Sequence, residues 1–125
     1  MNLSILPDSI AIVRLSPEQE IPQWVWQDRS FLSLTCTTEE LSIVCASSSV
    51  PTAVQCEKDW VAIKVQGPLD FSLTGILAAL AGPLAAHGIP IFAISTFDTD
   101  YLLVKERDLS RAKGALEQAG HIFAW

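Results

Sequence analysis

The sequence predicts an α+β fold in which two helices cover one face of a four-stranded antiparallel sheet. Two observations in its second half support this prediction. Apolar residues that alternate with polar ones indicate strands, and apolar residues at helical spacing indicate helices between those strands. The resulting order, β-α-β-β-α-β over about 65 residues, is typical of the ferredoxin-like split βαβ arrangement.

The first half of the chain indicates a reduced version of the same order. A strand is expected over residues 9–15, followed by a short helix, bounded by prolines, over residues 17–26. Two apolar runs, residues 31–37 and 41–46, flank a polar turn and predict a β-hairpin. Residues 47–58 would connect the two halves. No residue-level repeat is visible, so the idea of a duplication depends on element order alone.

The second half contains four predicted strands and a clear second helix. In residues 60–65, Val61, Ile63 and Val65 alternate with Trp60, Ala62 and Lys64, as in a strand with one buried face. Residues 89–95 form a continuous apolar run of strand length. A short gap separates that run from residues 101–104, which favours a hairpin. A helix is expected over residues 109–119, and the last strand over residues 122–125.

The first helix of this half is expected to bury one apolar stripe, formed by Leu73, Ile76, Leu77, Leu80 and Leu84. Asp70 or Ser72 would cap its first turn, and Gly88 would follow its last turn. Pro83 lacks an N–H group, so it should kink this helix or start a second short one. Asp108 is the expected cap of the second helix.

The charge of the chain excludes one class of partner. The chain has 8 basic and 14 acidic residues, a formal net charge of −6 and an isoelectric point near 4.7. A surface of this sign repels phosphate backbones, and no basic cluster offsets it, so we expect no nucleic-acid binding. Hydrophobic residues make up 50% of the chain, which is enough for a folded core.

One uncharged stretch, residues 73–97, is long enough to span a membrane. Gly82, Pro83, Gly88 and Pro90 interrupt it, so a helix followed by a buried strand explains the stretch better. The N-terminal residues show neither the basic region nor the cleavage site of a secretory signal. We therefore expect a cytoplasmic protein that makes no membrane contact.

Cysteine usage agrees with that location. The chain has three cysteines, Cys36, Cys45 and Cys56, and its two histidines, His87 and His121, are distant from them in sequence. An odd number of cysteines does not favour a disulfide framework, and the spacings do not match a zinc site. We expect buried thiols in a reducing compartment, with no metal and no cofactor.

Two polar segments, residues 67–75 and 95–101, are predicted to meet at one edge of the sheet, because a right-handed crossover makes the strands before them parallel. N–H groups around residues 71–73 would begin a helix at this edge and suit a carboxylate. Three acidic side chains suited to an ammonium group would lie there, Asp70, Asp98 and Asp100, with hydroxyl groups from Ser72, Thr74 and Thr96. A free α-amino acid carries both groups, so this chemistry predicts amino-acid binding.

Residues 60–121 resemble an ACT domain, the amino-acid-sensing module of allosteric enzymes. The resemblance is carried by GPLDFSLTGIL at residues 67–77 and ISTFDTDYLLVKE at residues 94–106. Both motifs are similar to those of small bacterial proteins with two ACT domains in tandem. The resemblance therefore implies two ACT-like units in tandem, a reduced one over residues 1–58 and a regular one over residues 59–125.

The resemblance also implies a ligand site between ACT units. Carried over by position, the ligand-binding residues on the loop entering the first helix are Asp70, Phe71, Ser72, Leu73 and Thr74. On the following hairpin they are Thr96, Phe97 and Asp100. The implied function is a regulatory, non-catalytic sensor of a free amino acid or a similar zwitterion. An exposed sheet edge is a ready pairing surface, so we also expect a homodimer.

Other interpretations remain at the same residues. Asp70 could serve only as a helix cap, and Asp98 only as a turn residue. Three carboxylates at one edge could bind Mg²⁺ or Ca²⁺. No nucleophile is visibly paired with a base, so we do not expect an enzyme. The alternative function is a scaffold or regulatory subunit that has lost its ligand and acts through protein contacts.

Overall fold

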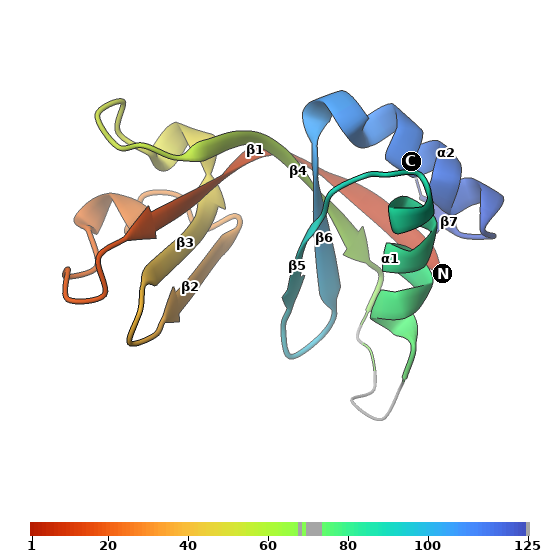
Figure 1. The fold of residues 1–125 in the computed structure, drawn as a ribbon, viewed down its shortest axis with the longest axis horizontal. Helices are drawn as coiled ribbons and strands as arrows, with labels where there is room; N and C mark the ends of the chain where they lie inside the picture. Colours follow the sequence, from red (N-terminus) through yellow and green to blue (C-terminus); the bar gives the residue numbers. More distant parts are fainter. Residues whose placement is uncertain (68, 70–73, 125) are drawn as a thin grey trace. The chain divides into compact units, whose positions relative to one another are not determined.

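In a computed structural model the chain forms two compact units (Figure 1). The C-terminal unit consists of residues 1–7 and 61–125, and the N-terminal unit consists of residues 8–60. The structure describes residues 1–67, 69 and 74–124.

The C-terminal unit has the predicted β-α-β-β-α-β order and the ferredoxin-like fold. Its elements are β4 (Glu57–Val65), α1 (Ile76–Ala86), β5 (Phe92–Ser95), β6 (Asp100–Lys105), the 3-10 turn η3 (Glu106–Asp108), α2 (Leu109–Gln118) and β7 (Ile122–Phe123). The predicted hairpin is confirmed, since β5 and β6 pair antiparallel with Ser95 opposite Asp100. Strand β6 lies between β4 and β5 in the sheet.

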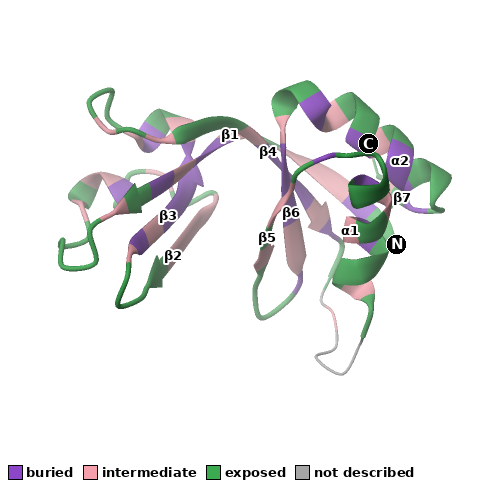
Figure 2. Ribbon diagram, viewed as in Figure 1, coloured by how far each residue is buried: buried purple, intermediate pink, exposed green. Residues whose placement is uncertain are grey.

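The core of this unit lies between the sheet and the two helices. It is formed by Ile63 and Val65 of β4, Leu102 and Val104 of β6, Leu80 and Leu84 of α1, and Ala112, Ala115 and Leu116 of α2, together with Leu3 and Ile89. Buried and exposed positions alternate along both helices (Figure 2). One face of the sheet is therefore covered by helices, as the sequence predicts.

The sheet of the C-terminal unit differs from the prediction at β1 (Asn2–Leu15). The start of β1 lies between β4 and β7, pairing in parallel with β7 through Asn2 and Leu3 and accepting a hydrogen bond from Gln66 N–H. The predicted start at residue 9 is wrong, because β1 already begins at Asn2. Residues 1–7 group with the C-terminal unit. Leu3 is fully buried, so this segment completes the core.

The N-terminal unit contains the rest of β1 with η1 (Gln23–Trp26), β2 (Leu32–Cys36), β3 (Leu41–Ala46) and η2 (Ser47–Ser49). The predicted hairpin is confirmed, because β2 and β3 pair antiparallel and β3 also pairs with β1. The helix predicted over residues 17–26 is wrong in extent. Pro22 precedes η1, and only a 3-10 turn of 4 residues follows it.

Helix α1 begins later than predicted. The apolar stripe predicts a start near Leu73, whereas Gly75 occupies the N-cap with a left-handed φ of 77°. Glycine adopts this conformation without the steric cost that a Cβ atom would add. The predicted caps, Asp70 and Ser72, lie outside the described residues. Leu77, expected in the buried stripe, is 37% exposed.

Asp108 occupies the N-cap of α2 but makes no capping hydrogen bond. A capping side chain requires extended backbone angles at that residue, and η3 gives Asp108 helical ones instead. Its carboxylate lies 3.8 Å from Arg111 Nη1. The predicted capping role is therefore replaced by an ion pair within the first turn of α2.

Pro83 lies inside a continuous α1, so a second short helix does not form. Proline has no N–H group to donate to the carbonyl four residues earlier, that of Ala79. His121 supplies a donor instead, with its Nε2 atom 3.2 Å from the Ala79 oxygen. The ring is 9% exposed and joins the middle of α1 to the residue that precedes β7.

No helix among residues 1–67, 69 and 74–124 is long and apolar enough to cross a membrane. The cysteines differ in exposure: Cys45 is buried, Cys56 is half-buried and Cys36 is exposed. The expectation of buried thiols is therefore wrong for Cys36. Burial, with smaller contributions from Cys56 and Asp28, raises the pKa of the Cys45 thiol to about 11.

Replacing His121 by alanine should lower the free energy of unfolding by about 1–2 kcal/mol, because α1 loses a donor and the buried ring leaves a cavity. The matched control is His87→Ala. His87 is exposed, and its Nδ1 atom lies 2.9 Å from the Pro83 oxygen, so we expect a loss below about 0.5 kcal/mol. Urea unfolding followed by circular dichroism measures both. Equal losses would contradict the role assigned to His121.

The three thiols should react with iodoacetamide in order of exposure at pH 8, Cys36 first and Cys45 only on unfolding. The thiol of Cys45 ionises near pH 9.0 when unfolded but near 11 when folded. Its contribution to stability is therefore constant below pH 9 and decreases as the pH rises toward 11. Mass spectrometry of the labelled native protein measures the order, with Cys36→Ser as control. Early labelling of Cys45 would contradict it.

Candidate functional site

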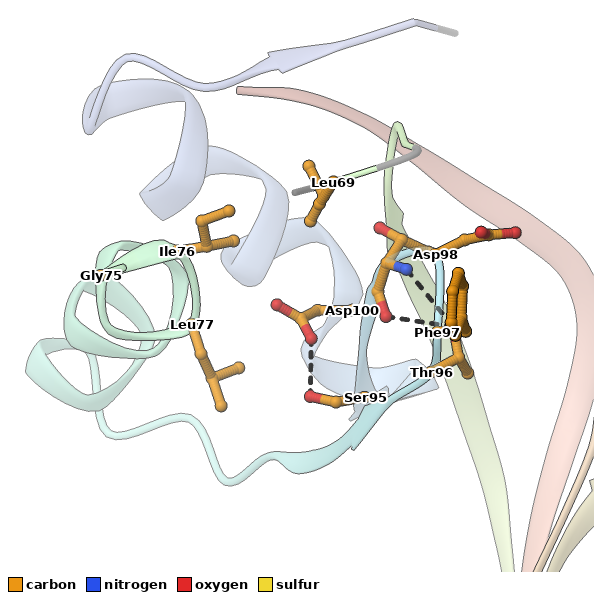
Figure 3. Close-up of a pocket in the computed structure, with 10 residues that line it drawn as sticks. Leu69, Gly75, Ile76, Leu77, Ser95, Thr96, Phe97, Asp98 and Asp100 are labelled. Carbon is orange, nitrogen blue, oxygen red and sulfur yellow. Dashed lines mark hydrogen bonds between the residues drawn. The ribbon is translucent and has the colours of Figure 1, made fainter. Parts of the chain in front are cut away.

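A cavity of about 310 Å³ lies between the first turn of α1 and the β5–β6 hairpin (Figure 3). Both elements belong to the C-terminal unit. The lining residues are Leu69, Gly75, Ile76, Leu77, Ser95, Thr96, Phe97, Asp98, Thr99 and Asp100. The volume is at the lower end of those known for small-molecule sites.

The hairpin contributes a carboxylate to this cavity. Asp100 begins β6, lies opposite Ser95 of β5 and is half-buried. Ser95 Oγ donates a hydrogen bond of 2.6 Å to Asp100 Oδ1, which orients the carboxylate. In Figure 3 the second oxygen of Asp100 points toward α1. An oriented, partly desolvated carboxylate is a suitable acceptor for an ammonium group.

Helix α1 contributes its positive end on the opposite side. The hydrogen bond from Ala79 N–H to the oxygen of the N-cap residue Gly75, at 2.9 Å, begins the helix. The N–H groups of Ile76 and Leu77 lie before it, in the turn where an α-helix offers no acceptor of its own. The helix dipole adds partial positive charge there. The donors expected around residues 71–73 lie outside the described residues, and the helix begins at Ile76 instead.

The turn of the hairpin is closed by Thr96 and Thr99. Thr96 N–H donates to the Thr99 oxygen at 2.8 Å, and the hydroxyl of Thr96 donates to the same oxygen at 3.1 Å. Phe97, at the tip, is 79% exposed, and Asp98 beside it is exposed as well. The side chains of Phe97 and Asp98 therefore lie outside the core, at the rim of the cavity.

The same turn is fastened to the segment that follows β4. Leu69 N–H donates to the Asp98 oxygen at 2.7 Å, and the buried Thr99 hydroxyl donates to the Val65 oxygen. A Cβ atom on Gly67 would lie 2.9 Å from the Asp98 oxygen and 3.2 Å from Thr99 Cβ. Only glycine fits at position 67 without moving the turn. Gly75, by contrast, has open space around it and is needed for its φ angle.

The structure brings part of the predicted site together. Thr96, Phe97 and Asp100 line the cavity, while Thr74 is exposed and is not among the lining residues. Four predicted residues, Asp70, Phe71, Ser72 and Leu73, lie outside the described residues. Their participation, like that of the lining residues, stays a prediction.

Sequence reasoning missed several lining residues, namely Leu69, Ile76, Leu77, Ser95 and Thr99. Ser95 could have been found, because a four-residue hairpin loop places it opposite Asp100. Ile76 and Leu77 were assigned to the buried stripe, since periodicity gives no signal for a late helix start. In the described part of the chain, no three His, Cys, Asp or Glu side chains group so as to hold a metal ion.

Comparison with known families decides what this fold is. The family model of the ACT domain matches residues 55–118, about half of the chain. The chain belongs to the ACT-domain family. A second family model, described as an N-terminal domain, matches residues 8–53.

One curated protein and one solved structure are similar to this ACT-domain protein. The rat "cytosolic arginine sensor for mTORC1 subunit 1" is 44% identical over 52 residues, which are 41% of this chain and 16% of the rat protein. The chain thus matches less than a fifth of that curated relative. A solved structure from Agrobacterium tumefaciens is 43% identical, with a TM-score of 0.91 over 98% of this chain and 90% of that one.

A regulatory subunit of aspartate kinase has a similar fold at low identity. The ligand-free regulatory subunit of aspartate kinase from Thermus thermophilus has a TM-score of 0.62 at 13% identity, covering 90% of this chain and 91% of that one. At this identity the likeness shows the fold alone.

Gly67→Ala should lower the free energy of unfolding by about 1–3 kcal/mol, because the new Cβ atom meets backbone that cannot rotate away. The matched control is Gly114→Ala in α2, where nothing lies within 4 Å of the Cβ position and no proline follows. That change should raise stability by about 0.5–1 kcal/mol, since alanine favours helix. Thermal unfolding measures both, and a neutral Gly67→Ala would contradict the close contact.

Proposed function

We propose that this protein is a non-catalytic regulatory sensor that binds a free α-amino acid in the cavity beside Asp100. One observation carries the proposal. A carboxylate from the hairpin and the first turn of α1 face the same cavity of about 310 Å³. A free amino acid has an ammonium group for the first and a carboxylate for the second.

In this binding mode the ligand bridges two elements. Its ammonium group donates to Asp100, which Ser95 holds in place. Its carboxylate accepts from the N–H groups of Ile76 and Leu77 at the positive end of α1. Both contacts are charge-assisted, and the partly buried position strengthens them relative to contacts in bulk water.

The remaining walls accommodate the side chain of the ligand. Leu69, Ile76 and Leu77 are apolar, and Phe97 stands at the rim with an exposed ring. Asp98 adds a second carboxylate at the tip of the hairpin. The walls therefore favour a side chain with an aliphatic stem, and Asp98 favours a positive charge at its end. The rat relative is named as an arginine sensor, which supports this choice of ligand class.

Regulation would follow from differential affinity. A ligand that contacts both α1 and the hairpin stabilises the arrangement in which the two face each other. The described residues that line the cavity include no histidine and no cysteine, which supports a sensor rather than an enzyme. Strand β5 lies at the edge of its sheet, and we propose that this edge pairs in a cytoplasmic homodimer.

The first test is a thermal-shift screen with each of the twenty amino acids at millimolar concentration. A ligand at about 100 times its Kd stabilises the native state by roughly 2.7 kcal/mol, which shifts Tm by several degrees. We expect one amino acid, or a small related group, to raise Tm. A flat panel would contradict ligand sensing and favour the scaffold function, which a search for stable protein partners then tests.

Asp100→Asn should weaken binding of the amino acid found in this screen at least tenfold, because the neutral amide loses a charge-assisted bond to the ammonium group. Calorimetry measures the affinity. The control is Glu117→Gln, which removes one negative charge from an exposed position on α2 and should leave the affinity unchanged. Equal affinities for the wild type and Asp100→Asn would rule out the assigned role of Asp100.

A further inference from the structure

A second cavity, of about 340 Å³, lies in the same C-terminal unit but on different residues. It is lined by Ser4, Lys64, Gln66, Gly67 and Ala124. Ile63 and Val65 pack into the core beneath the helices. Because side chains alternate along a strand, Lys64 and Gln66 lie on the opposite face of the sheet. This cavity is therefore separate from the one beside Asp100.

Lys64 is unusual among the basic residues of this chain. It is half-buried, and its side-chain ammonium group makes no hydrogen bond or ion pair with residues 1–67, 69 or 74–124. Arg111, by comparison, lies 3.8 Å from the Asp108 carboxylate and also donates to the His87 oxygen. Lys64 is thus a half-buried cation without a described ion pair, in a chain with a formal net charge of −6.

The polar side chains around Lys64 can all donate. An ammonium group offers three N–H donors, the amide of Gln66 offers two and the hydroxyl of Ser4 offers one. The side chains of Ser4 and Gln66 likewise make no hydrogen bond within the described part of the chain. The amide of Gln66 and the hydroxyl of Ser4 can also accept, but Lys64 can only donate. Among the described residues that line the cavity there is no carboxylate. A lysine cation flanked by two further groups that can donate matches an anion.

We infer that this cavity binds a small anion through its carboxylate or phosphate oxygens, with Lys64 as the charged contact. Lysine acts as a point charge and recognises both groups. The negative charge of the whole protein opposes the approach of an anion, so binding is expected in the millimolar range. The inference does not depend on amino-acid binding beside Asp100, because none of its side chains lines that cavity.

Nuclear magnetic resonance of the full chain tests the site. Backbone amide signals are followed while sodium phosphate or sodium acetate is added, with sodium chloride keeping the ionic strength constant. We expect the signals of residues 4, 64, 66 and 67 to shift and saturate with at least one of the two anions. Saturation with phosphate alone, acetate alone or both identifies the group that the site recognises.

Lys64→Gln should weaken the saturating interaction at least tenfold, while Lys64→Arg, which retains the charge, should preserve it. The matched control is Arg107→Gln, which removes one positive charge from an exposed position in η3 and should leave the affinity unchanged. The spectrum of each variant reports whether it is folded. Asp100→Asn should also bind the anion normally, which separates this site from the amino-acid site.

Shifts that grow linearly with both anions, without saturation, would overturn the inference. Equal affinity in wild type and a folded Lys64→Gln would overturn it as well, because the anion would then bind elsewhere.

Discussion

The site depends on a backbone contact between two segments far apart in the sequence. Gly67 lies so close to the Asp98 carbonyl that no larger residue fits, and Leu69 N–H donates to the same carbonyl. Thr99 adds a third link, to Val65. These contacts fix where the hairpin turn stands relative to the end of β4. Since Asp100 directly follows that turn, its distance from α1 is determined by backbone packing, which is less adjustable than side-chain packing.

A site of this design divides its charges between two elements. The acceptor comes from a strand, where Ser95 orients it, and the donors come from a helix terminus, where the backbone itself provides them. In the proposed binding mode neither half would bind a zwitterion well alone, since each would recognise one of its two groups. Because backbone N–H groups do not vary with sequence, selectivity among amino acids would then lie with the side chains of Leu77, Phe97 and Asp98.

The sequence predicted both hairpins and the order of helices and strands in the C-terminal unit. In these segments apolar residues recur clearly, at every second position in the strands and at helical spacing in the helices. The prediction failed at the start of β1, where Asn2 and Leu3 pair with β7 near the other end of the chain, a long-range contact that a local pattern does not reveal. It failed at the start of α1, since Gly75 takes the N-cap with a positive φ that apolar spacing does not reveal. In the candidate site, the position of Asp100 could be predicted from the chemistry of its side chain and from the order of the strands. The positions of Leu69 and Ile76 could not, because they depend on the path of the chain between β4 and α1.

The bond between His121 and the Ala79 carbonyl has a consequence for how the unit opens. Pro83 leaves a gap in the ladder of α1, and the residue that fills it belongs to the segment leading into β7. Fraying of that segment therefore weakens the helix whose first turn borders the cavity. Hydrogen exchange along α1 and at β7 would then be governed by a shared opening event, so that the two elements form one cooperative block.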